Sequence, residues 1–256
     1  MTAILIFFFA HWYLSLFSQT FFLHRYAAHK MFTMNPFWEK FFFLFQFVTQ
    51  GASYLSPRAY SILHRMHHAY SDTEKDPHSP HHSKNVFEMM WKTKNVYQEY
   101  LEHKRAPEER FILDVPHWEN LEKIGESWFF RIFFGTLYVL FYINFVPAGM
   151  WYLYLLLPIH FLMGPIHGAI VNWSGHVHGY QNFNANDKSR NTLMWDFLCL
   201  GELFQNNHHM YPRKANLALK WFEFDPTYQM IRIFNALGIV KIKPQTVAVE
   251  YGVGTF

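Results

Sequence analysis

The sequence of 256 residues has little of three things that would point to common classes of protein. Its single cysteine, Cys199, excludes a disulfide-stabilised fold and a zinc or iron–sulfur site built on cysteines. Charged residues make up only 16%, against about 25% in an ordinary soluble domain. The net charge of +3 is too small to indicate a nucleic-acid partner. No stretch rich in glycine and serine divides the chain, so we expect one domain over residues 1–256.

What the sequence has in abundance is apolar residues (51%) and aromatic residues (21%). Residues 3–23, 129–146 and 148–171 are long apolar runs with almost no charge. Each is close to the ~20 residues that cross the hydrocarbon core of a membrane as a helix. Three such runs are too many for the core of one small soluble protein. They predict an all-α integral membrane protein with three spans.

Residues 37–54 form a fourth, weaker apolar segment. Glu39 and Lys40 lie at its start and Gln46 interrupts it, so the apolar stretch is too short to span. We expect an interfacial or re-entrant helix here.

The distribution of basic residues predicts the orientation of the chain. Ten of the 22 Lys and Arg lie in residues 58–123 and eight lie after residue 187, whereas residues 144–149 have none. By the positive-inside rule, residues 58–127 and 179–256 form a cytoplasmic cap over a transmembrane stem.

Histidine is the unusual residue of this chain, with 17 copies. Four motifs contain the clusters: HRYAAH at 24–29, HRMHH at 64–68, NWSGH at 172–176 and QNNHH at 205–209. If residues 37–54 do not span, all four motifs lie on the cytoplasmic side, at the ends of the predicted spans. One isolated histidine would most simply be a surface or packed residue. Eight at the same ends indicate a shared site.

Helical spacing shows how these histidines can be divided. At about 100° per residue, His64, His67 and His68 lie on one helix face, yet the neighbours His67 and His68 diverge enough to serve two different ions. His24 and His29 are about 140° apart, which fits either two ions or a helix that loosens at its end.

The chemistry of these residues favours iron. Asn172 and His176 are four residues apart and share a helix face. Imidazole suits iron, zinc, copper or nickel, and one zinc ion takes about four ligands, so eight histidines indicate two ions. The chain has neither the Glu-x-x-His pairs of carboxylate di-iron bundles nor a His-Glu-x-x-His motif. These observations favour a dinuclear, histidine-rich, non-haem iron site.

The motif spacing resembles a known family. H-x4-H, H-x2-H-H and a third motif ending in H-H are similar to the three histidine boxes of the membrane fatty acid desaturases. Residues 171–180 and 201–212 resemble the acyl-CoA Δ9 (stearoyl-CoA type) desaturases, in particular short bacterial members of that group. The Asp-Pro-His sequence at 76–78 also fits, and the resemblance covers about residues 21–242.

The resemblance implies an oxidoreductase that acts on paired donors and reduces O2 to water. It implies that hydrogens are removed from a long-chain acyl-CoA or acyl-lipid, leaving a cis double bond at the Δ9 position. The cofactor would be two iron ions, with O2 as co-substrate and a bent apolar tunnel for the acyl chain. No His-Pro-Gly-Gly haem motif is present, so we expect an external electron donor of the ferredoxin or cytochrome b5 type. The protein would lie in the lipid bilayer as a multi-pass protein, with its boxes on the cytoplasmic face of a bacterial inner membrane.

The same resemblance implies roles for individual residues, and no catalytic residue beyond the metal ligands. Asn172 matches the residue that holds a water on one iron. Asp196 and Glu202 are expected behind the ligand imidazoles. The expected iron ligands are His24, His29, His64, His67, His68, His176, His208 and His209.

The chain departs from the family at two places that concern the site and the substrate. The third box of the family usually begins with histidine, but here the residue is Gln205. We expect Gln205 to reach one iron as a weak oxygen ligand or through a water. Before the second box, the animal enzymes carry an Arg-Asp pair that contacts the coenzyme head group. This chain has Ile62 and Leu63 instead, so the choice between a CoA thioester and an acyl lipid stays open.

Three alternatives have different signatures. A related di-iron membrane hydroxylase or a carotenoid ketolase would have a similar site and differ in its product. A b-type cytochrome would need histidine pairs in the middle of its spans, and a structural membrane protein would bind no metal. Among the remaining histidines, His160 and His167 are expected to pack between helices. His178 is the rival of His176, and His78 is expected at the surface or behind the ligands.

Overall fold

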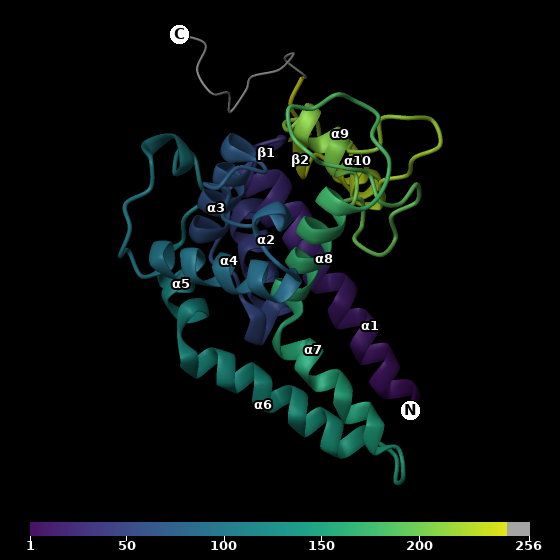
Figure 1. Ribbon diagram of the computed structural model, residues 1–256. Coiled ribbons are helices and arrows are strands. Elements are labelled where there is room, and N and C mark those ends of the chain that lie inside the picture. Colours follow the sequence, from purple (N-terminus) through teal and green to yellow (C-terminus); the bar gives the residue numbers. More distant parts are fainter. Residues whose placement is uncertain (245–256) are drawn as a thin grey trace.

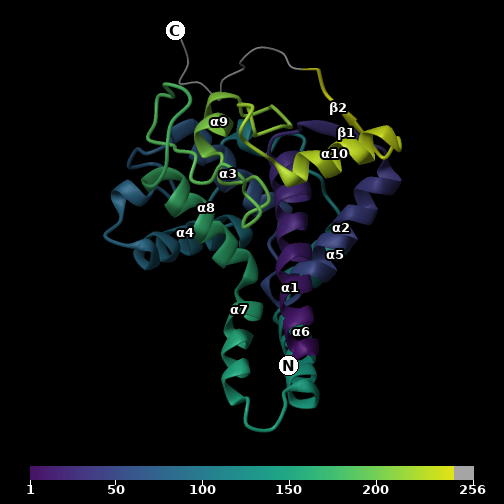
Figure 2. The same cartoon turned by 90° about the vertical axis from the view of Figure 1, so that its right-hand side faces the viewer.

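The computed structural model describes residues 1–244 and consists mainly of helices (Figure 1). Its α-helices are α1 (Thr2–Phe17), α2 (Pro36–Gln50), α3 (Pro57–Tyr70), α4 (Val86–Leu101), α5 (Glu119–Glu126), α6 (Trp128–Phe145), α7 (Leu157–Phe161), α8 (Met163–Val177), α9 (Gln205–Met210) and α10 (Pro226–Ala236). The π-helical segment η1 (Ser18–Ala28) continues α1, and the 3₁₀ turns are η2 (Gly51–Ser53), η3 (Pro80–His82), η4 (Glu109–Phe111) and η5 (Trp151–Leu156). Figure 2 shows α1, α6 and α7 as a stem below a broader head that contains α3, α9 and α10.

Two helices are long and apolar enough to cross a membrane. They are Thr2–Ala28, which joins α1 to η1, and Trp128–Phe145. The expected span over residues 148–171 is broken into a pair of helices, Trp151–Phe161 and Met163–Val177, with a bend of 75° between them, so the pair forms either one broken span or a re-entrant loop. The bend has a local cause. Proline has no N–H group and cannot continue an uninterrupted helix, but it is tolerated in the first turn, where Pro165 lies in α8.

Helix α2 lies against the head rather than in the stem and is not among the helices long enough to span. Asn35 caps its first turn by accepting a hydrogen bond from the Trp38 N–H at 3.0 Å, and Pro36 occupies its first position. Its outer face is exposed and apolar. Large side chains project from that face at helical spacing: Phe37, Phe41, Leu44 and Val48. An exposed apolar stripe on a short helix suits a membrane interface, which stays our prediction for residues 37–54.

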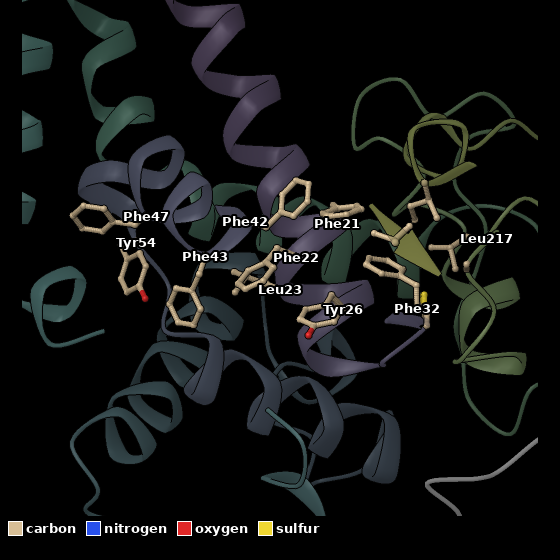
Figure 3. Close-up of a cluster of buried hydrophobic side chains, with 14 of the residues drawn as sticks. Phe21, Phe22, Leu23, Tyr26, Phe32, Phe42, Phe43, Phe47, Tyr54 and Leu217 are labelled. Carbon is tan, nitrogen blue, oxygen red and sulfur yellow. The ribbon is translucent and has the colours of Figure 1, made fainter. Parts of the chain in front are cut away.

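The largest buried core lies where η1 meets α2 (Figure 3). Phe21 and Phe22 of η1 pack against Phe42 and Phe43 of α2, with aromatic ring centroids 4.6 Å (Phe21–Phe42) and 5.4 Å (Phe22–Phe43) apart. Burying such rings is among the largest contributions that single side chains make to stability. This core fixes η1, and therefore the first histidine motif, relative to the rest of the head.

A two-stranded antiparallel ribbon joins distant parts of the chain. Strand β1 (Phe32–Met34) pairs with β2 (Val240–Ile242), with Thr33 opposite Lys241. The ribbon was not expected from the sequence. Strands of three residues carry too little alternation of polar and apolar residues to be recognised.

The absence of a side chain at Gly51 allows α6 to pack closely against η2. Gly51 has a φ of +48°, and a Cβ at this position would overlap the hydroxyl of Tyr138 on α6. We predict that Gly51→Ala destabilises the protein by about 1–3 kcal/mol, through backbone strain and steric overlap. The thermal midpoint of the purified protein in detergent measures the effect.

Gly149→Ala is the matched control, since Gly149 also has a positive φ (+81°) but open space around it. Adding Tyr138→Phe to Gly51→Ala should recover part of the loss by removing the overlapping oxygen. Equal midpoints for Gly51→Ala and Gly149→Ala would contradict the steric part of the prediction.

Candidate metal centre

The first histidine motif lies at the end of a widened helix. In η1 the backbone follows the π-helical pattern, and the His29 N–H donates to the His24 carbonyl at 3.1 Å, a bond between residues five apart. This pattern brings His24 and His29 to the same side, with ring centroids 4.9 Å apart. Of the two interpretations that the spacing allowed, the structure shows the loosened helix end.

The second motif divides between two groups. On α3, His64 and His68 are one turn apart and have Nε2 atoms 3.1 Å from each other. His67 lies between them in sequence and points to different partners, the Nε2 atoms of His176 and His209, each at 3.2 Å. Adjacent positions on one helix thus serve two clusters.

Group one contains five histidines whose ligand atoms all lie within 4.8 Å of one another. Its members are His24 in η1, His29 directly after η1, His64 and His68 in α3, and His208 in α9. Its Nε2 atoms face each other at short range: His29–His64 at 2.6 Å, His24–His208 at 2.9 Å and His68–His208 at 2.9 Å. All five are buried or nearly so.

Group two contains three histidines from α3, α8 and α9 under the same distance limit: His67, His176 and His209. Each has an aspartate on its other nitrogen. The Nδ1 atoms lie 2.8 Å from Asp76, 3.0 Å from Asp72 and 2.5 Å from Asp187, respectively.

These carboxylates determine which nitrogen carries the proton. An ionised carboxylate can only accept hydrogen bonds, so each Nδ1 must donate its N–H and each Nε2 must present a lone pair. Three Nε2 lone pairs then face one another with no hydrogen between them. A cation at the centre removes this repulsion, and the separations of 3.2 Å from His67 Nε2 to the Nε2 atoms of His176 and His209 are those of neighbouring nitrogen ligands ~2.0–2.1 Å from one ion. The donor set of the described residues therefore fits a metal.

Electrostatics favour the neutral, ligand form of most of these imidazoles. Burial, followed by neighbouring histidines, lowers the pKa of His64, His68 and His208 well below the usual value. His67 differs: burial lowers its pKa, but the carboxylates of Asp76, Asp72 and Asp187 together raise it overall. Burial by itself would raise the pKa of Asp187, yet His209 holds it well below its usual range.

Glu202 supports group one in a similar way. Its Oε2 lies 2.5 Å from His24 Nδ1, so this carboxylate, predicted to lie behind a ligand imidazole, contacts an imidazole of group one. The fully buried Arg25 contacts Glu202 at 3.3 Å and Asp225 at 2.8 Å, and Thr20 donates to Glu202. Group one thus has one carboxylate partnered by an arginine, whereas group two has three aspartates.

Asp196 does not contact a ligand imidazole, although the sequence placed it there. Its carboxylate accepts backbone N–H groups from Cys199, Gly201 and Leu203 at 2.8–3.0 Å. Burial raises the pKa of Asp196 to about 6. The side chain therefore organises the turn before α9. In a short loop, an aspartate can accept hydrogen bonds from nearby backbone N–H groups. The sequence pattern does not distinguish this arrangement from a contact between the aspartate and a histidine.

Sequence reasoning missed Asp72 and Asp187 as partners of histidines. Asp72 lies four residues after His68, and Asp187 lies in a loop far from any box. The only sequence feature that could have indicated these partners is the presence of carboxylates in loops near the histidine boxes. The spacing does not show which of these carboxylates would contact a histidine.

An apolar cavity of about 1150 Å³ reaches group one. His24 and His64 line it, and the Tyr60 ring, which also lines it, stacks on His64 at a centroid distance of 5.8 Å. Asn172 and Gln205 line the same cavity. The side chain of Gln205 packs against Gly175, and its Nε2 donates to the Glu202 carbonyl at 2.7 Å, so its Oε1 is the amide atom left for another partner.

Four of the histidines outside the two groups lie in three different settings. His178 is exposed at the end of α8 and is not in either group. His160 lies in the stem, where its two nitrogens meet His11 at 2.6 Å and the Tyr142 hydroxyl at 2.9 Å, so His11 also has a partner that the sequence did not indicate. His78, expected at the surface or behind the ligands, is buried next to His67.

The structure combines helices able to span a membrane with histidine groups able to bind metal, and an apolar cavity reaches one of these groups. These features are those of a histidine-rich membrane protein that can bind metal. The chain belongs to the fatty acid desaturase family, whose sequence model matches residues 1–236. Membership makes it an oxidoreductase. This confirms the family resemblance seen in the motifs.

Individual relatives agree with the family. The chain is 28% identical over 228 residues to Delta-9 desaturase-like 4 protein of Arabidopsis thaliana, covering 87% of this chain and 70% of the relative. It is 28% identical over 222 residues to Delta-9 acyl-lipid desaturase 2 of the same plant, with 84% and 66% covered. It is 27% identical over 230 residues to the sn-1 stearoyl-lipid 9-desaturase of Synechocystis sp., with 87% and 67% covered.

We predict that Asp187→Asn weakens metal binding by group two about 10- to 100-fold, because the neutral amide no longer fixes the proton on His209 Nδ1. Competition with a chelator, followed by metal analysis, measures this. Asp114→Asn, in an exposed part of the head, is the control and should release metal like the unaltered chain. Equal release from both variants would show that the aspartate does not support the site.

Proposed function

We propose that the chain is an O2-dependent Δ9 fatty acyl desaturase that introduces a cis double bond into a long-chain acyl lipid at a pair of iron ions. The observation that carries this proposal is that group one lies at an apolar cavity, because two of its members, His24 and His64, line that cavity. Family membership and the names of the Δ9 relatives support the reaction class.

The eight histidines would hold the irons in the two groups, five around one ion and three around the other. The neutral imidazoles and the aspartate partners suit iron, although the same ligands also bind zinc. Asn172 and Gln205 reach the cavity near these groups, and in the proposal each acts on one iron through a water or as a weak oxygen ligand.

When bound, the iron pair supplies the oxidising power, taken from O2 and external electrons, that breaks unactivated C–H bonds. The chain's own residues do the rest. The Asp72, Asp76 and Asp187 carboxylates keep the proton on Nδ1 of each imidazole in group two. The cavity walls would hold the acyl chain beside His24 and His64 and exclude water, which would fix the carbon that reacts.

The cavity favours an acyl lipid over a CoA thioester. Its volume of about 1150 Å³ exceeds the ~300–1,000 Å³ of most ligand pockets and suits a long chain. Among its described lining residues the only Lys and Arg are Lys94 and Arg131, and Arg131 already donates to the carbonyls of Ala52 and Tyr54. Ile62 and Leu63 are buried in the apolar cluster of α3, where they cannot bind a phosphate-rich head group.

The remaining parts of the proposal concern the surroundings of the protein. We place the head on the cytoplasmic face of a bacterial inner membrane, on the distribution of Lys and Arg. A separate ferredoxin or cytochrome b5 type of protein would supply the electrons.

Expression in a host that lacks unsaturated fatty acids of this kind tests the reaction. Gas chromatography with mass spectrometry of the host lipids should show a new cis-Δ9 acyl chain, found in intact glycerolipids before it appears in the CoA pool. His64→Ala, His68→Ala and His209→Ala should abolish the product while the protein stays in the membrane, because each removes a nitrogen from a metal group.

His178→Ala is the matched control, since His178 is exposed and outside both groups, and it should retain activity. A hydroxylated or keto product in place of the double bond would show that the chain inserts oxygen instead. Full activity of His64→Ala would show that the ligand assignment is wrong.

We predict that Gln205→Ala lowers activity without removing all of the iron, and that Gln205→His is tolerated. The reason is that an amide oxygen binds iron much more weakly than imidazole does, so its loss affects the chemistry more than the retention of metal. Product yield and iron content measured on the same preparations separate the two effects. Loss of all iron from Gln205→Ala would contradict this role.

A further inference from the structure

The apolar cavity that reaches group one opens to the surface between α4 and α6. Several residues that line it are also exposed: Phe87 (82%) and Trp91 (63%) on α4, and Trp128 (76%) and Ile132 (63%) on α6. Leu162, in the bend between α7 and α8, lines the cavity and is exposed as well. A side chain that lines a cavity and is exposed at the same time lies at an opening, so these residues mark the rim.

One face of α4 forms the first wall of this opening. Phe87, Trp91, Lys94 and Gln98 all line the cavity, and their spacing of 4, 3 and 4 residues places them on one helix face. The face is apolar near the start of the helix and polar further along. Lys94 is exposed, and its Nζ lies 4.5 Å from the centre of the Trp91 ring. This wall therefore suits a ligand that has an apolar chain and a polar end.

The second wall belongs to α6, one of the two helices long and apolar enough to cross a membrane. Trp128, Ile132 and Gly135 line the cavity with the spacing of one helix face, and Trp128 is the first residue of the helix. Figure 1 shows α4 at the lower edge of the head, above α6. Tryptophan is enriched where lipid head groups meet the hydrocarbon core. An opening at the first turns of a span faces the bilayer rather than bulk water.

The cavity continues from this opening to the histidines. One face of α8, with Gly168 and Asn172 on it, lines the cavity up to the turn that carries His176. A Cβ at Gly168 would meet open space, so there is room for a ligand along α8. His24 and His64 line the cavity at group one. A chain that enters between α4 and α6 can therefore reach a histidine group without leaving the cavity.

The charges at the opening fit a membrane lipid. Lys94 and Arg131 are the Lys and Arg among the described lining residues, and Glu102 and Glu126 line the cavity too. An opening with as many carboxylates as cations does not attract a head group that carries several phosphates. An acyl chain esterified in a bilayer glycerolipid needs only a small polar contact at the rim, which Lys94 can provide.

We propose that the groove between α4 and α6 is a lateral entrance, through which the acyl chain of a glycerolipid passes from the bilayer to group one. The ester and the head group stay at the rim beside Lys94 and Gln98, and the chain lies along Ile132 and Gly168. The inference rests on the proposed function in that this glycerolipid is the substrate. Binding of the chain in the groove does not require a metal.

The experiment uses the full chain in phosphatidylcholine vesicles, in which a small fraction of the lipid carries a diazirine in the middle of one acyl chain. Irradiation, proteolysis and mass spectrometry identify the labelled peptides. We expect label on α8 around Gly168, because no residue of α8 is exposed and the inner part of the cavity runs along it. A diazirine-labelled acyl-CoA, added from water to the same vesicles, forms the second arm.

Variants of α6 test the route. Ile132→Trp narrows the groove and should lower the label on α8 at least about tenfold, while label on the exposed face of α6 stays the same. Gly135→Leu should do the same if Ile132→Trp fails to fold, since a Cβ at Gly135 lies at an ordinary contact distance of 3.6 Å from Phe161. Ile143→Trp is the matched control, because Ile143 is exposed on α6 outside the cavity, and its label should equal that of the unaltered chain.

Two results overturn the proposal. One is label on α8 from the lipid that is equal in Ile132→Trp, Gly135→Leu and Ile143→Trp. The other is label on α8 from the acyl-CoA alone, which would show that the chain enters from water. A protein that takes up the lipid label on α8 but forms no double bond would instead contradict the proposed function and leave the entrance intact, so the two failures are distinguishable.

Discussion

The contact on which the rest of the site depends is the one between an aspartate and the Nδ1 of a histidine. Asp72, Asp76 and Asp187 each fix the proton on one imidazole, and this turns three Nε2 lone pairs toward one point. Without a cation that arrangement is repulsive. The fold therefore holds the three side chains in place by other means, through α3, the end of α8 and the short α9, and the loops that carry the aspartates close over them.

The architecture places the histidine groups at the junction of two environments. The stem helices are apolar on their exposed faces, while the head buries charged pairs such as Arg25 with Asp225. The π-helical segment η1 crosses between the two. Its hydrogen bonds between residues five apart bring His24 and His29 together, and its aromatic face anchors α2. One segment thus positions part of histidine group one and part of the core.

The two histidine groups differ in their electrostatic surroundings as well as in number. Glu202 in group one is paired with Arg25, so the charge near that group is largely balanced. Group two has three aspartates, each on the Nδ1 of one imidazole. A metal in group two therefore has fewer described nitrogen ligands but more negative charge behind them, and the two ions of a pair would not be equivalent.

The sequence by itself determined the apolar runs, the helical class, the family and the histidine motifs, because these are properties of local composition and spacing. It also predicted that His67 and His68 would diverge, and their contacts differ in this way. Glu202, predicted behind a ligand imidazole, contacts His24. Only the tertiary structure decided which aspartates support the site, since Asp187 reaches His209 by a loop whose path no local pattern encodes. The break of residues 148–171 into two helices, the three-residue strands, the bonding of Asp196 to its own turn and the burial of His78 were likewise decided by packing between distant segments. Local spacing determines which residues share a helix face. Packing between segments that are distant in the sequence determines which residues that face contacts.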